Sequence, residues 1–108
     1  MAYDKGLAQR IEDTLGEMDG LETKKMFGGV GYMLNGNMAM GILGGGLIVR
    51  TGPERYEKLL GRPHTGTFGT GRAMRGWVTV EPEGISEDAD LEEWIGIGVA
   101  FAASLPPK

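Results

Sequence analysis

Few residues in this chain are of a type that makes or breaks bonds. His64 is the only histidine and cysteine is absent, which excludes thiol nucleophiles, disulfides and the common zinc sites. The only serines, Ser86 and Ser104, lie outside the Gly-x-Ser-x-Gly turn that exposes a hydrolase nucleophile. His64 stands in a turn-forming sequence, Pro63 to Gly66, and we interpret it as a loop histidine. The sequence therefore predicts no catalytic residue, no metal ligand and no cofactor, and we do not expect an enzyme.

Two patterns resemble ligand-binding motifs, and both are incomplete. Asp88, Asp90 and Glu92 are spaced like the start of a calcium loop, but Glu93 and Val99 stand where that loop needs glycine and glutamate. The two glycine clusters, 28–31 and 44–46, complete neither of the common phosphate-binding motifs. We interpret the acids as charges near the start of a helix, where they are stabilised by its dipole.

The polar group that most suggests a ligand is basic. It consists of Arg72 and Arg75, with Arg50 and His64 as further members. Guanidinium groups donate paired hydrogen bonds to carboxylate or phosphate, so these residues would form an anion-binding patch if the chain folds back over Arg50. The alternative is that the arginines form salt bridges with the acidic segment that follows them.

Charge is unevenly distributed along the chain, whose net charge is −4. Six bases and two acids lie between Arg50 and Arg75, whereas seven acids and no base lie between Glu81 and Glu93. This distribution fits either two solvated surfaces or a polarised docking surface. The negative total opposes attraction to polyphosphate, and no basic helix is present, so direct DNA binding is the least favoured alternative.

Hydrophobic spacing predicts the elements of the first half of the chain. Apolar residues at steps of three and four predict a helix that Asp4 caps and Gly20 ends. An antiparallel meander should follow, with strands at Met26 to Leu34, Met38 to Leu43 and Leu47 to Arg50. The Asn35-Gly36 pair is typical of a two-residue hairpin turn. In the first strand, Met26, Val30, Tyr32 and Leu34 share one face, and Gly29 and Gly31 on the other face indicate a close neighbour or a bend.

The second half predicts two helices and two strands. Thr51 with Glu54 fits a capping box for a helix that ends at Gly61. A short strand is expected around Thr67-Phe68 and a longer one at Met74 to Val80, with Met74, Val78 and Val80 on one face. A third helix should run from Asp90 to about Ser104.

The end of this third helix is uncharged on all sides from Ile97 to Ala103. A helix that is apolar all round is covered on several sides. The cover is either the domain's own core and loops or a second subunit. The candidate dimer interface is therefore Ile97, Val99 and Phe101, and Phe27, Trp77 and Trp94 are read as core or interface residues.

The length of 108 residues suits one domain, 1–108, with the order α-β-β-β-α-β-β-α. Strand runs joined by tight turns and flanked by helices predict a two-layer α+β fold, an antiparallel sheet with helices packed against it. The stretch from Met26 to Val49 is uncharged, but eight glycines interrupt it, so no membrane helix is expected. With no cysteine and no signal peptide at Met1 to Lys5, the expected location is the cytoplasm.

Several segments resemble one known family, the N-terminal domain of the TfoX/Sxy competence regulators. The most specific is the Lys-Met-Phe-Gly-Gly-Val-Gly-Tyr segment from Lys25 to Tyr32. Further matching segments span nearly the whole chain: Leu34 to Met38, Gly41-Ile42, Leu47 to Arg50, Thr70 to Val78, Trp94-Ile95 and Phe101 to Lys108.

The resemblance implies a fold similar to the type III secretion chaperones, a homodimer, and a bacterial cytoplasmic protein. Full-length relatives regulate competence genes by helping a transcription regulator, and they carry a second domain that has no counterpart in this sequence. The family offers no catalytic residues to carry over. We therefore expect a non-enzymatic protein-interaction domain with a transcription-accessory role; an anion- or small-molecule-binding protein is the alternative.

Overall fold

The computed structural model describes residues 3–26, 28–69 and 71–108, so Phe27 and Thr70 lie outside the described residues. Its centre is one antiparallel sheet of six strands in the order β1-β2-β3-β4-β6-β5. In chain order the elements are α1 (Lys5–Leu15), β1 (Leu21–Met26), β2 (Gly29–Leu34), β3 (Asn37–Leu43), β4 (Gly46–Arg50), α2 (Tyr56–Leu60), β5 (Thr65–Thr67), β6 (Trp77–Val80), the 3₁₀ turn η1 (Pro82–Ile85) and α3 (Asp88–Ser104).

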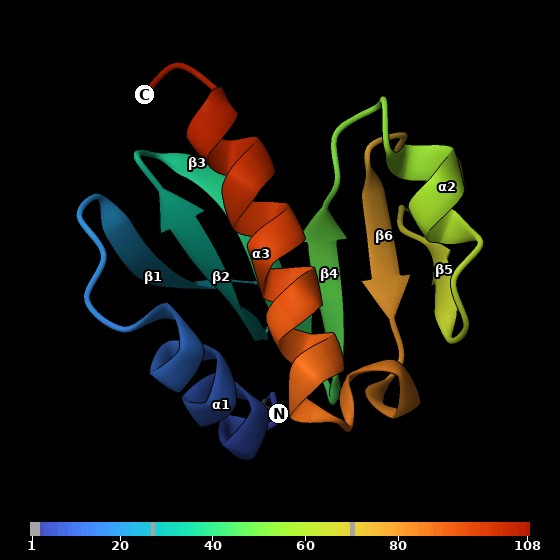
Figure 1. The fold of residues 1–108 in the computed structure, drawn as a ribbon, viewed down its shortest axis with the longest axis horizontal. Coiled ribbons are helices and arrows are strands. Elements are labelled where there is room, and N and C mark those ends of the chain that lie inside the picture. Colours follow the sequence, from blue (N-terminus) through green and yellow to red (C-terminus); the bar gives the residue numbers. More distant parts are fainter. Residues whose placement is uncertain (1–2, 27, 70) are drawn as a thin grey trace.

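Helices cover one face of this sheet. α3 runs across the middle strands and α1 lies beside it, which gives the two layers seen in Figure 1. The predicted α+β class and the succession of helices and strand runs are confirmed. Among the described residues, no helix is both long enough and apolar enough to cross a membrane.

The hairpins follow the predicted turn chemistry, with one addition. Asn35 and Gly36 both have positive φ, 53° and 85°, as the turn between β2 and β3 requires. The chain also reverses at Gly28, where φ is 76°, so a further strand, β1, pairs with β2. β1 is an edge strand and is polar along most of its length. Hydrophobic alternation therefore did not predict it.

Three helix boundaries differ from those predicted. Asp4 caps α1 as expected, since its Oδ1 accepts from the Leu7 amide at 3.1 Å, but α1 ends at Leu15 with Gly16 as its C-cap, before the predicted end at Gly20. The capping box is wrong, because Thr51 is buried and its hydroxyl donates to the carbonyl of Gly52 at 2.9 Å, while α2 begins at Tyr56. α3 begins at Asp88, so Asp90 lies inside its first turn rather than at its cap.

The core lies between the sheet and the helices. Tyr32, Met40, Val49 and Val78 are paired across four neighbouring strands and are fully buried under the helix layer. The Tyr32 hydroxyl donates to Glu12 of α1, and burial together with that carboxylate raises the pKa of Tyr32. Of the predicted shared face, Val30, Tyr32 and Leu34 are all buried, whereas Met26 belongs to the separate strand β1.

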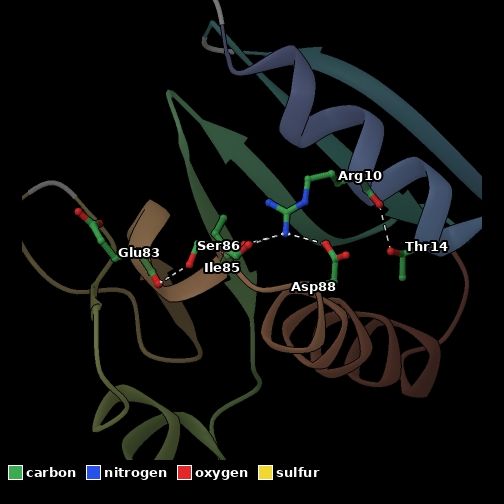
Figure 2. Close-up of polar contacts among 6 residues, drawn as sticks. All are labelled: Arg10, Thr14, Glu83, Ile85, Ser86 and Asp88. Carbon is green, nitrogen blue, oxygen red and sulfur yellow. Dashed lines mark hydrogen bonds and ion pairs between the residues drawn. The ribbon is translucent and has the colours of Figure 1, made fainter.

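One arginine fixes the end of the helix layer. Figure 2 shows Arg10 of α1 reaching the end of η1 and the first turn of α3. Its Nη2 donates to the Ile85 carbonyl at 2.9 Å and to Asp88 Oδ1 at 3.1 Å. Part of the acidic segment therefore serves to hold α1 against α3.

Candidate docking groove

The structure separates His64 from Arg50, two of the four residues expected to form an anion-binding patch. Arg50 pairs with Trp77 at the start of β6, whereas His64 directly precedes Thr65, which pairs with Val80 at the end of β6. Three residues along a strand span roughly 10 Å. His64 therefore lies at the opposite end of the strand from Arg50.

Arg50 and Arg75 are engaged by aromatic rings. The Arg50 guanidinium lies 5.2 Å from the Trp77 ring and 5.4 Å from the Phe101 ring. That of Arg75 lies 5.8 Å from the Tyr56 ring and donates to Glu57 Oε2 at 3.3 Å. Both charges are used inside the domain, and neither reaches the acidic segment between Glu81 and Glu93.

The acidic segment pairs with other bases. Arg62 donates to Glu93 Oε2 at 2.8 Å and stacks over the Trp94 ring at 5.2 Å. This hydrogen bond and the guanidinium charge lower the pKa of Glu93. The alternative was that Arg50, Arg72 and Arg75 form salt bridges with this segment. The arginines that pair with it are instead Arg10, with Asp88, and Arg62, with Glu93.

His64 lies in a turn, as predicted, with a left-handed backbone at φ 60°. The pairing of β5 with β6 brings Glu81 beside His64, and the Glu81 amide donates to the His64 carbonyl at 2.8 Å. Glu83 follows two residues later. Possible ligand atoms of His64, Glu81 and Glu83 lie within 4.8 Å of one another, and all three residues are exposed. Among the described residues, no fourth side chain of this kind joins them, and the hydroxyls of Ser86 and Ser104 bond to backbone carbonyls of their own turns.

The residues of the candidate dimer interface differ in exposure. Ile97 is only 6% exposed because it packs into the domain's own core. Val99 and Phe101 are partly exposed, and the Phe101 ring lies against Gly52. A groove of about 490 Å³ runs between this end of α3 and the segment 51–55.

The most distinctive surface is on the opposite face of the sheet. It is a groove of about 330 Å³ with an almost wholly apolar lining: Val30, Met38, Gly41, Ile42, Leu43, Ile48, Phe68, Met74 and Trp77. We call it the open-face groove. Leu43 and Met74, at 43% and 45% exposure, are the large hydrophobic side chains that stand out as exposed in the described part of the chain.

Glycine forms part of the groove floor. Gly31, Gly41 and Ile48 are paired across β2, β3 and β4 and point away from the helix layer. A Cβ at Gly41 would lie 2.7 Å from the Met38 methyl and 3.0 Å from the Val30 carbonyl oxygen. The close neighbour predicted for the face of Gly29 and Gly31 is seen at Gly29, where a Cβ would meet the Ile42 carbonyl oxygen. Gly41, on the facing strand, was not part of that prediction, and the missing side chains leave a depression.

The wall of the groove comes from the loop between β5 and β6. The Met74 amide donates to the Phe68 carbonyl at 2.6 Å, which closes the loop and turns Met74 toward the open face. The Phe68 and Trp77 rings lie 6.1 Å apart. The prediction that Met74 shares a strand face with Val78 and Val80 is wrong, because β6 begins only at Trp77.

The comparisons with known proteins yield one family. The model of the family described as TfoX N-terminal domain matches residues 13–102, which include every strand of the sheet and the whole lining of the open-face groove. No curated protein matches the chain.

Proposed function

Because the chain belongs to the TfoX N-terminal domain family, we propose that it is a non-enzymatic, cytoplasmic protein-interaction domain with a transcription-accessory role related to competence regulation. We further propose that a partner protein docks in the open-face groove. The observation that carries this proposal is the exposure of Leu43 and Met74 at one continuous apolar groove. A contiguous exposed apolar patch is typical of an interaction surface in a small domain.

The chemistry of the groove fits a protein ligand. Its lining offers almost no polar group to orient a small substrate, whereas small-molecule sites usually place a few polar groups among apolar ones. Met38 and Met74 line it, and methionine adapts its shape to different apolar side chains.

The alternatives have less support. The anion- or small-molecule-binding alternative expected Arg50, His64, Arg72 and Arg75 to converge, and His64 lies at the opposite end of β6 from Arg50. Direct DNA binding is opposed by the net charge of −4.

Photo-crosslinking from the groove tests the proposal. Because the chain has no cysteine, Met74→Cys creates a single attachment point for a photoreactive group, and Glu92→Cys on α3 is the matched control. In cells of the source organism we expect a discrete protein adduct from position 74 that is at least about tenfold weaker from position 92, in line with a site-specific interface. Equal adducts from both positions, or none from position 74, would contradict the proposal.

The expected homodimer is a second part of the proposal, carried by the groove beside α3. Ala100 is exposed and lines this groove, so Ala100→Glu should place a charge in the subunit contact and lower self-association at least about tenfold. Sedimentation equilibrium measures this, with Thr14→Glu on α1 as the control. A wild-type chain that stays monomeric at high micromolar concentration would rule out the homodimer and leave the open-face groove unaffected.

A further inference from the structure

We propose that the occupant of the open-face groove is an acidic amphipathic segment of a partner protein, whose apolar side chains fill the groove and whose carboxylates face Lys24 and Arg72. This inference rests on the proposed function, because it names the chemistry of the partner that docks there. It follows from the way charge is divided between the two faces of the sheet.

Two bases, Lys24 and Arg72, flank the open-face groove, with one acid of the sheet, Glu22, on the same face, although the whole chain is acidic. Lys24 pairs with Gly31, which pairs with Gly41 of the groove floor, so these three residues point to the same side. Neighbouring strands are about 4.8 Å apart, so the backbone of Lys24 lies roughly 10 Å across the sheet from Gly41. Arg72 stands at the other side, two residues before Met74 in the loop that forms the wall.

These two bases are available for a partner. Both are exposed, and within the described ranges neither makes an ion pair, whereas Arg10, Arg62 and Arg75 do. Glu22 is the acid nearest in the sheet, two residues before Lys24 on the same face. Most other acids lie on α1, α2, η1 and α3, on the helix side of the sheet or at its ends.

The shape of the surface favours a protein segment over a membrane. The groove is a depression with Gly41 on its floor, so it can receive side chains from a partner. The net charge of −4 also opposes adsorption of the whole domain to an anionic bilayer. A volume of about 330 Å³ is near the lower end of the range for ligand sites and fits a few apolar side chains. A helix with apolar residues at i, i+3 and i+4 presents such a set.

Synthetic helical peptides test the inference. Three fluorescent probes share one length: a leucine/phenylalanine stripe flanked by glutamates, the same stripe flanked by lysines, and a serine stripe flanked by glutamates. Fluorescence anisotropy with the full chain at low salt should show the first binding about tenfold or more tighter than the second, since two charge pairs are exchanged for repulsions. The serine-stripe probe should not bind, and added salt should weaken the first probe.

Variants locate the effect. Arg72→Glu, at an exposed loop position, should reduce the tenfold preference for the glutamate-flanked probe at least about threefold, because one of two favourable charges is reversed. Leu43→Ser with Met74→Ser should remove binding of both apolar probes. Thermal melts of each variant confirm that the fold is retained.

The outcomes separate the two proposals. If the lysine-flanked probe binds as tightly as the glutamate-flanked one and the serine variants abolish both, the acidic partner is wrong and the docking groove stands. If neither apolar probe binds, or if the serine variants bind normally, the docking groove itself is wrong. Stronger binding to phosphatidylglycerol vesicles than to any probe would overturn the inference in favour of a lipid surface.

Discussion

Replacing Gly98 with valine should destabilise the domain by roughly 1–3 kcal/mol, the usual penalty for extra volume in a packed interior. Gly98 lies on α3 where that helix crosses β3, and a Cβ there would be 2.5 Å from the carbonyl oxygen of Ala39. The obstacle is backbone, so it cannot be relieved by a change of rotamer. The helix would have to move away from the sheet.

Gly96 provides the matched control for this substitution. It lies on the same helix, is exposed, and has nothing within 4 Å of the position of a Cβ. Gly96→Ala should stabilise the domain by up to about 1 kcal/mol, because alanine favours a helix interior over glycine. Urea unfolding followed by circular dichroism measures both. If Gly98→Val leaves the free energy of unfolding unchanged, α3 does not rest on β3 at this point.

Truncation of the two tryptophans should separate stability from binding. Trp94 is 3% exposed and packs in the core beneath Arg62. Trp94→Ala should lower the free energy of unfolding by roughly 3–5 kcal/mol. Since domains of this kind have about 5–15 kcal/mol in total, the variant should be close to unfolding at physiological temperature.

Trp77 lies on the open face and should behave differently. It is half-buried and contacts the Phe68 ring and the Arg50 guanidinium. Trp77→Ala should cost only about 1–2 kcal/mol for these two contacts, yet reduce binding of the glutamate-flanked probe at least tenfold by opening the groove wall. Thermal melts measure the loss of stability, and fluorescence anisotropy measures the loss of probe binding. A Trp77 variant that binds normally would remove this residue from the docking surface.

Local signals in the sequence were sufficient for most of the fold. The Asn35-Gly36 pair specified its turn because both positions need positive φ, and the apolar steps of α1 specified its buried face. The prediction that the uncharged end of α3 is covered on several sides holds only in part, because Ile97 packs in the domain's own core whereas Ala100 is exposed. These features depend on residues within a few positions of each other.

Features that depend on distant residues could not be predicted in the same way. β1 is stabilised by pairing with β2, so its own polar sequence gives little indication of a strand. His64 meets Glu81 only because β5 and β6 pair. The open-face groove combines Gly41 with Phe68 and Met74 from a loop that the sequence placed partly in a strand. The only sequence signal for it was the glycine face of the meander.

Methyl NMR on methionine-labelled protein tests the central claim most directly. Met38 and Met74 line the open-face groove, whereas Met40 is fully buried under the helices and Met18 packs at the end of α1. On titration with the glutamate-flanked probe, the ε-methyl signals of Met38 and Met74 should shift progressively, while those of Met40 and Met18 stay in place. Shifts at Met18 with Met38 and Met74 unchanged would place binding on the helix side of the sheet and contradict the account.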